Sequence, residues 1–229
     1  MPQTLALLHT SPTLSPMFNE LCARILPGVR ILHFVDESLI KNTIAAGRLE
    51  KATMRRLINL VASTFDAGAD ACLVTCSSIG PAVDIAAGLH DEPVIRVDAA
   101  MAEQAVAQGR KVGVLATLST TLGPTVDLVR RKAAEGGREI ELVEHLCQGA
   151  FEAVMAGDGA THDRIVGEAI TQSMRGVDAI VLAQASMARV VSALPPEAIP
   201  APVYSSPELG VERARDVLRG LPSAQGLAA

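Results

Sequence analysis

The chain has 229 residues, enough for one large domain or two small ones with a substantial core. Hydrophobic residues make up 49% of it and charged residues 20%, proportions that are typical of a folded chain rather than a disordered one. A net charge of −5, the lack of a basic block and an aromatic content of only 2% argue against a nucleic-acid-binding surface.

Short apolar runs alternate with amphipathic stretches along the whole chain. Eight runs rich in Val, Ile and Leu predict strands, at Thr4–Leu8, Val29–Val35, Ala71–Thr75, Val94–Val97, Lys111–Leu115, Glu139–Val143, Ala179–Leu182 and Pro202–Tyr204. Six helices are predicted between them, at Leu14–Ile25, Glu50–Ala67, Ala99–Ala107, Thr120–Ala134, Asp163–Met174 and Glu208–Arg219. Most strands lack polar alternation, so the pattern predicts an α/β protein whose mostly parallel sheets carry helices on both faces.

The cysteine spacing and the lengths of the apolar runs bear on metal binding and on the cellular compartment. Cys22, Cys72, Cys76 and Cys147 match no zinc spacing, so no metal site is expected. Leu5–Leu8 is too short for the apolar region of a signal peptide, and no run approaches the ~20 apolar residues of a membrane span. We therefore expect a cytoplasmic protein with free thiols and with no membrane or nucleic-acid partner.

The chain contains a diverged internal repeat. The segment 69–78 resembles the segment 177–186, which places Asp70 opposite Asp178 and Ser78 opposite Ser186, 108 positions apart. The same separation without gaps aligns 7–14 with 115–122, including Ser11 with Ser119, and 30–32 with 138–140. The general likeness of strand–helix units is the alternative explanation, but the matched polar positions favour a duplication.

A duplication predicts two α/β halves related by a pseudo-twofold axis, with an active-site cleft between them. The expected boundaries are 1–108 for the N-terminal half and 109–216 for the C-terminal half. The C-terminal helix at 205–219 is a candidate for exchange onto the first half, and 222–229 is expected to be a flexible tail. Ligands of parallel sheets bind at the carboxyl ends of strands, where this chain places its polar loops.

The loop after the third strand carries a thiol, Cys76, followed by Ser77 and Ser78. A thiol at a helix N-terminus is placed where positive partial charge favours the thiolate, and nearby N–H groups favour a bound anion. The repeat places Gln184, followed by Ala185, opposite Cys76. The remaining candidates for substrate binding are Ser11, Thr117, Ser119 and Thr120.

Each candidate also has a purely structural explanation. Free cysteines are most often buried apolar residues, and serine and threonine routinely cap helices. A glutamine can serve as a structural hydrogen-bonding group, and a histidine at a strand end, such as His9, is often only a satisfied polar residue. Cys72, inside its strand, is expected to belong to the core.

The ordered set of motifs resembles the aspartate/glutamate/hydantoin racemase superfamily. The segment from Asp178 to Ala188 is similar to the second-half signature of that family, and Cys76-Ser77-Ser78 is similar to its first-half cysteine motif. Val112 to Thr117, with Thr120, resembles the family's strand and Thr-x-x-Thr loop. The resemblance implies the duplicated fold and cofactor-independent chemistry at the carbon next to a carboxylate or carbonyl. It also leaves a homo-oligomer open.

Family racemases use two thiols, one to remove the α-proton and one to return it, and here Gln184 stands where the second thiol is expected. An amide does not act as a general acid or base near pH 7. We therefore expect an isomerase of this superfamily that acts on a small, amino-acid-like carboxylate or other small anion through one catalytic thiol, Cys76. His9 is the candidate for a second proton donor.

Two alternatives stay open at this stage. A single thiol also suits a decarboxylase or a cis–trans isomerase of a small dicarboxylate, reactions found among relatives of the racemases. The loss of one thiol is equally consistent with a carboxylate-binding protein that has no catalytic activity.

Overall fold

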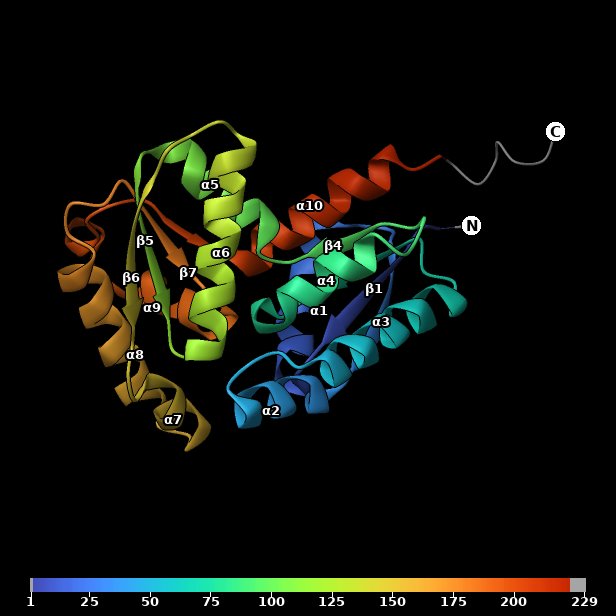
Figure 1. The fold of residues 1–229 in the computed structure, drawn as a ribbon, viewed down its shortest axis with the longest axis horizontal. Helices are drawn as coiled ribbons and strands as arrows, with labels where there is room; N and C mark the ends of the chain where they lie inside the picture. Colours follow the sequence, from blue (N-terminus) through green and yellow to red (C-terminus); the bar gives the residue numbers. More distant parts are fainter. Residues whose placement is uncertain (1, 223–229) are drawn as a thin grey trace. The chain divides into compact units, whose positions relative to one another are not determined.

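The computed structural model describes residues 2–222, and the expected tail at 222–229 lies outside that range except for Pro222. The chain divides into two compact units, one made of the residues up to Val97 with those from Pro207 onward, the other of Asp98–Ser206. Each unit is a four-stranded parallel sheet with helices on both faces, which confirms the predicted fold class (Figure 1).

The sheet of the first unit has the strand order β2-β1-β3-β4. Its strands are β1 (Thr4–His9), β2 (Arg30–Val35), β3 (Ala71–Val74) and β4 (Val94–Arg96). Its helices are α1 (Ser15–Ile25), α2 (Glu37–Ala46), α3 (Lys51–Asp66), α4 (Gly80–Ala87) and α10 (Ser206–Gly220), with short 3₁₀ turns η1 (Pro12–Leu14) and η2 (Ser77–Ile79).

The two faces of this sheet bury different side chains because neighbouring residues of a strand point to opposite faces. Leu5, Leu7 and Leu73 face one side and pack with apolar residues of α1 and α10. Leu8 and Val74 face the other side and pack with apolar residues of α2, α3 and α4. The edge strand β2 is only partly covered, since its residues are half-buried or exposed.

The sheet of the second unit repeats the arrangement in the order β6-β5-β7-β8. Its strands are β5 (Lys111–Ala116), β6 (Glu141–Leu146), β7 (Ala179–Leu182) and β8 (Val203–Ser205). Its helices are α5 (Ala99–Gln108), α6 (Ser119–Glu135), α7 (Ala150–Met155), α8 (Gly159–Glu168) and α9 (Ala188–Ala193), with the π-helix η3 (Ala169–Ser173) and the 3₁₀ turns η4 (Ala185–Met187) and η5 (Pro196–Ala198). Helices α6 and α8 lie on opposite sides of the sheet (Figure 1).

All eight predicted strands are present, but the ungapped repeat is wrong in two of its three blocks. It is wrong by three residues at 30–32, because β2 begins at Arg30 and β6 at Glu141, and by one residue in the block at 7–14. The separation of 108 matches β3 with β7, whereas Thr4–His9 matches Lys111–Ala116, one residue less. The strand-end hydrogen bonds agree, because Thr75 N–H donates to Leu8 O and Ala183 N–H donates to Leu115 O. Thr10, and not His9, is therefore the counterpart of Thr117.

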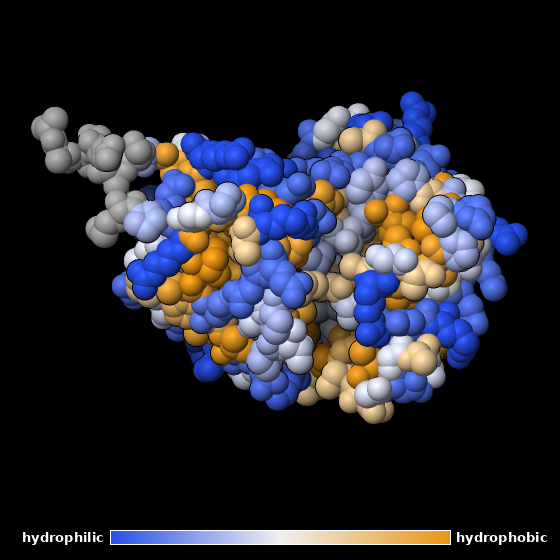
Figure 2. Space-filling view, turned by 180° about the vertical axis from the view of Figure 1, so that it is seen from behind, coloured by the Kyte–Doolittle hydropathy of each residue, from blue (hydrophilic) through white to orange (hydrophobic). Residues whose placement is uncertain are grey.

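The surface mixes polar and apolar side chains in small patches on the face drawn in Figure 2. Among residues 2–222, the large apolar side chains that are exposed are Val35, Ile85, Leu89 and Met155. Scattered apolar residues of this kind are ordinary on folded proteins. Within the same range, no helix has the length and apolar character needed to cross a bilayer.

Candidate active site

Cys76 lies where β3 gives way to η2 and α4. Its backbone is extended, with φ −131° and ψ 117°, and it is the residue before η2. As a whole residue Cys76 is half-buried, whereas Cys22, Cys72 and Cys147 are buried. Burial raises the pKa of Cys22 and Cys147 to about 11 and that of Cys72 to about 12, so these three thiols stay protonated.

Four donors converge on the Cys76 sulfur. The Thr10 hydroxyl, the Ser78 hydroxyl and the backbone N–H groups of Ser78 and Ile79 each act to lower the pKa of the thiol and so favour the thiolate. Burial has the larger effect, so the net result is a pKa of the Cys76 thiol above its ordinary value. The sulfur therefore carries its proton at neutral pH and has donors ready for the charge that remains when the proton leaves.

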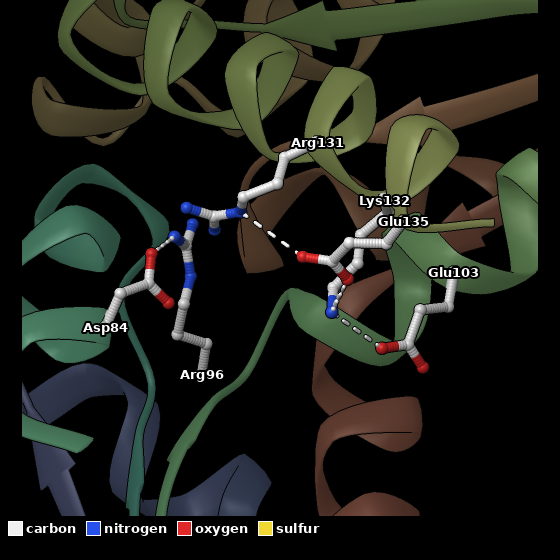
Figure 3. Close-up of polar contacts among 6 residues, drawn as sticks. All are labelled: Asp84, Arg96, Glu103, Arg131, Lys132 and Glu135. Carbon is white, nitrogen blue, oxygen red and sulfur yellow. Dashed lines mark hydrogen bonds and ion pairs between the residues drawn. The ribbon is translucent and has the colours of Figure 1, made fainter. Parts of the chain in front are cut away.

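Gly80, the first residue of α4, allows a buried arginine to lie against the start of the helix. A Cβ atom on Gly80 would lie 2.2 Å from Arg96 Nη2. The Arg96 guanidinium is almost fully buried, and its Nη1 donates to Asp84 Oδ2 at 2.6 Å (Figure 3). The pair joins the end of β4 to α4 and holds the helix that follows the thiol.

Gln184 occupies in the second unit the position that Cys76 occupies in the first, directly before the 3₁₀ turn after the third strand of its sheet. Its amide is engaged twice by the buried Thr117. Thr117 N–H donates to Gln184 Oε1 at 2.6 Å, and Gln184 Nε2 donates to Thr117 Oγ1 at 2.7 Å. These bonds give Gln184 a structural role and leave one amide hydrogen for a ligand. Ala185 starts the turn η4.

Thr120, at the start of α6, has a buried hydroxyl without a partner. Its side-chain oxygen is enclosed and makes no hydrogen bond among the described residues. The N–H groups of Ser119 and Thr120 open the helix and have no intrahelical acceptor. An unpaired buried hydroxyl is costly in a folded protein, so this position calls for a hydrogen-bonding partner from outside the chain, either a water molecule or a ligand.

The basic and acidic groups on α6 pair within the second unit. Lys132 contacts Glu103 at 3.1 Å and Glu135 at 2.8 Å, and Arg131 lies 3.9 Å from Glu135 (Figure 3). These pairs lie along the helix well past its first turn. The first turn of α6 itself carries no acidic side chain, which suits an anion.

His9 is fully buried at the end of β1, and both of its ring nitrogens have partners. Nδ1 lies 2.8 Å from Thr75 Oγ1 and Nε2 lies 2.9 Å from His33 Nδ1. Burial, and secondarily the neighbouring His33, lowers the pKa of His9 from 6.5 to about 4. His9 is thus a neutral ring at pH 7.

The remaining sequence candidates have these places. Ser11 caps η1, with its hydroxyl accepting from Thr13 N–H, and Ser77 is buried in η2. The structure brings Ser78 to Cys76 and Thr117 to Gln184 within their units. The sequence analysis missed Thr10, and its signal is the shifted repeat described above, which pairs it with Thr117.

No group of three or more His, Cys, Asp or Glu side chains within residues 2–222 is arranged to hold a metal ion. The groups that the candidate site does present are a thiol, hydroxyl groups and backbone donors. Hydroxyl and backbone N–H groups can donate hydrogen bonds to a carboxylate, and a thiol can transfer a proton.

A family model described as Asp/Glu/hydantoin racemase matches residues 8–214. The chain belongs to this family. A comparison with curated proteins found no match. Racemase structures share the fold at low identity. Glutamate racemase from Francisella tularensis, solved with D-glutamate, is 16% identical with a TM-score of 0.73, covering 95% of this chain and 81% of that one.

Two further racemase structures extend the likeness to other named activities. Aspartate racemase from Picrophilus torridus is 15% identical, with a TM-score of 0.71 and 94% coverage of both chains. Allantoin racemase from Klebsiella pneumoniae is 17% identical, with a TM-score of 0.68, covering 98% of this chain and 91% of that one. At these identities the likeness establishes the fold, while the family model identifies a racemase-family enzyme.

Proposed function

We propose that this racemase-family enzyme acts, without a cofactor, at the carbon next to the carboxylate of a small, amino-acid-like acid, with Cys76 as its single catalytic thiol. The observation that carries the proposal is the set of four donors around the Cys76 sulfur. Hydrogen bonds to a thiolate stabilise the charge that proton transfer leaves behind. The three buried cysteines have no comparable surroundings.

The protonation state of Cys76 determines whether the thiol acts as an acid or as a base. Because burial keeps the thiol protonated at neutral pH, Cys76 enters the reaction as a proton donor. The substrate carbon first becomes a carbanion equivalent, by removal of its α-proton by a base or by loss of CO₂. The Cys76 proton then passes to that carbon, the electron pair of the S–H bond stays on sulfur, and solvent later returns a proton to the thiolate. Gln184 cannot take part in proton transfer, since an amide is neither acid nor base at this pH.

The substrate carboxylate is proposed to bind through neutral donors. Thr120 supplies a buried hydroxyl that needs a partner, and it and Ser119 supply the first N–H groups of α6. A helix N-terminus favours a carboxylate. The other proposed binding residues are Ser11, Ser77, Ser78, Thr117, Gln184 and Ala185.

A decarboxylase or a cis–trans isomerase of a small dicarboxylate is the second candidate, and of these two the protonated thiol favours the decarboxylase. Loss of CO₂ leaves a carbanion equivalent that needs one proton and no base, which matches one protonated thiol. Racemisation needs in addition a base to remove the α-proton, and His9 is the titratable candidate of the sequence analysis. Its ring is neutral, but both nitrogens are already engaged.

The test is turnover by wild type, Cys76→Ala and a matched control, Cys22→Ala, on amino acids, hydantoins, malonates and maleates. Proton NMR in D₂O separates the reactions: exchange of the α-proton without loss of substrate marks racemisation, and deuterated product with CO₂ release marks decarboxylation. We expect Cys76→Ala to abolish turnover and Cys22→Ala to keep it. Undiminished turnover in Cys76→Ala refutes the proposal.

A ligand screen by thermal shift accompanies the assay. A carboxylate that raises the melting temperature of wild type, with no reaction on any substrate of the panel, identifies a carboxylate-binding protein instead. Thr120→Val is the matched binding variant, because valine keeps the shape of threonine and removes the hydroxyl.

A further inference from the structure

Two cross-strand side-chain pairs extend the β1–β3 ladder beyond its last backbone pair. The ladder ends with Leu8 opposite Val74, closed by Thr75 N–H donating to Leu8 O at 3.0 Å. The next pair is His9 with Thr75, whose Nδ1 and Oγ1 are 2.8 Å apart. The pair after it is Thr10 with Cys76, which the same register places side by side, and the Thr10 hydroxyl acts to lower the pKa of the thiol.

The two pairs lie on opposite faces of the sheet. The His9 ring packs 5.4 Å from the ring of Phe18, on the face covered by α1 and α10. Cys76 packs with the apolar residues of the other face, which α2, α3 and α4 cover. Successive residues of a strand alternate in this way, so a pair on one face sets the register of its neighbour on the other.

The His9 ring is held at its other end by a chain of side chains that reaches the surface. Nε2 lies 2.9 Å from Nδ1 of His33, and Nε2 of His33 lies 2.8 Å from Oδ1 of Asn19. His33 and Asn19 are exposed. In a neutral arrangement His9 Nε2–H donates to His33 Nδ1 and His33 Nε2–H donates to Asn19 Oδ1. His9 Nδ1 is then an acceptor for the Thr75 hydroxyl, which also lies 3.3 Å from Leu8 O as a donor. The chain fixes the tautomer and the orientation of the buried ring.

The second unit lacks this pair. By the strand correspondence, Ala116 stands where His9 stands and Ala183 where Thr75 stands. There Gln184 is long enough to bond Thr117 directly and twice. A cysteine side chain is too short to make two such hydrogen bonds with the neighbouring strand end. The His9–Thr75 pair thus occurs in the unit that has the thiol. There it can hold Thr10 beside residue 76, as the two Gln184–Thr117 bonds hold Thr117 beside residue 184 in the second unit.

We propose that His9 is a positioning residue for Cys76: through Thr75 it locks the ends of β1 and β3 in the register that keeps the Thr10 hydroxyl on the sulfur. The inference rests on the proposed function only in treating Cys76 as the reacting group. Its physical content is the hydrogen bonding of the thiol, which is measurable without any substrate.

The experiment measures the pH midpoint of Cys76 alkylation by iodoacetamide, followed by mass spectrometry of the peptide that contains it. Thr10→Val removes the hydroxyl and is expected to raise the midpoint by about one pH unit, the effect of one hydrogen bond to a charged group. Thr75→Val and His9→Gln are expected to raise it in the same direction. Thr75→Ser keeps a hydroxyl and is expected to restore the wild-type midpoint.

His9→Asn is the variant that separates positioning from general packing. The amide of asparagine reaches the place of the histidine Nδ1 and keeps the bond to Thr75, whereas the amide of glutamine reaches the place of Nε2 and loses it. We expect a wild-type midpoint in His9→Asn and a raised one in His9→Gln. If Thr75→Val and His9→Gln keep the wild-type midpoint while Thr10→Val shifts it, the proposal is overturned.

The Thr75→Val and Thr75→Ser variants keep the test decisive even if a His9 variant does not fold, because neither is larger than threonine. Melting curves of each variant establish folding before alkylation. A failure of this test leaves the proposed function standing, because Cys76 can react without His9. Conversely, a protein that turns over no substrate can still show the expected order of midpoints.

Discussion

The buried histidine of β1 makes the stability of the protein depend on pH in a defined window. His9 has an ordinary pKa of 6.5 when exposed and a pKa of about 4 in the folded chain. Between these values the unfolded chain binds a proton at His9 and the folded chain does not. The contribution of a neutral buried His9 is therefore present above pH 6.5 and is lost as the pH falls toward 4.

The magnitude follows from the two pKa values. Each pH unit between the two pKa values changes the free energy of unfolding by about 1.4 kcal/mol. Acidification from pH 7.5 to 4.5 therefore lowers the free energy of unfolding by about 2.5 kcal/mol through this one group. The side chain is fully buried, so solvent screening does not reduce the figure greatly. The exposed His33, whose pKa burial also lowers, adds a smaller effect of the same sign.

The assay is urea unfolding of wild type and His9→Asn at several pH values between 4.5 and 7.5. Asparagine keeps the bond to Thr75 and has no titrating group, while all carboxylates and His33 are common to both proteins. We expect the free energy of unfolding of wild type to fall about 2.5 kcal/mol more than that of His9→Asn over this range. Parallel pH profiles would refute the reasoning, since they require His9 to titrate alike in both states.

Three further substitutions have defined outcomes. Gly80→Ala is expected to lower the free energy of unfolding by about 1–3 kcal/mol in urea titration, because its Cβ would collide with the buried Arg96, whereas Gly123→Ala, with open space around it, is expected to cost nothing. Thr120→Val is expected to leave that free energy within about 0.5 kcal/mol of wild type while weakening carboxylate binding about tenfold or more in calorimetry, and equal affinity would contradict the binding role. Asp178→Asn is expected to lower the melting temperature at pH 7, because two backbone N–H groups hold the pKa of that carboxylate low, and the difference from wild type should disappear as the pH falls below it.

The strands were predictable because their burial leaves an unmistakable apolar pattern. Helix α2 was missed although the chain carries both of its end signals: Asp36 accepts from Ser38 N–H at its start, and Gly47 adopts a left-handed conformation at its end. The exposed, partly covered edge strand β2 was found from its apolar residues alone. What the pattern could not reveal is that its exposed His33 supports a buried group.

The candidate site was predictable where one sequence segment carries the whole pattern, as in Cys76 to Ser78. Thr10 was missed because an ungapped repeat pairs His9 with Thr117, and the missing residue that corrects the pairing falls in a stretch with little similarity. The bond between Gln184 and Thr117 joins two loops that are adjacent in space only because β5 and β7 are neighbours. Contacts of that kind depend on sheet order, which local patterns do not encode.

The double bond between Gln184 and Thr117 has a consequence for anyone who would install a second thiol in this scaffold. Replacing the amide with cysteine removes an acceptor from a buried main-chain group and a donor from a buried hydroxyl in one step. A thiol is too short and too weak a hydrogen-bonding group to satisfy either. In the first unit a cysteine opposite a threonine has the His9–Thr75 pair beside it, and the second unit has alanines at both of those positions. Converting this lobe into a two-thiol catalyst therefore needs more than the single exchange at residue 184.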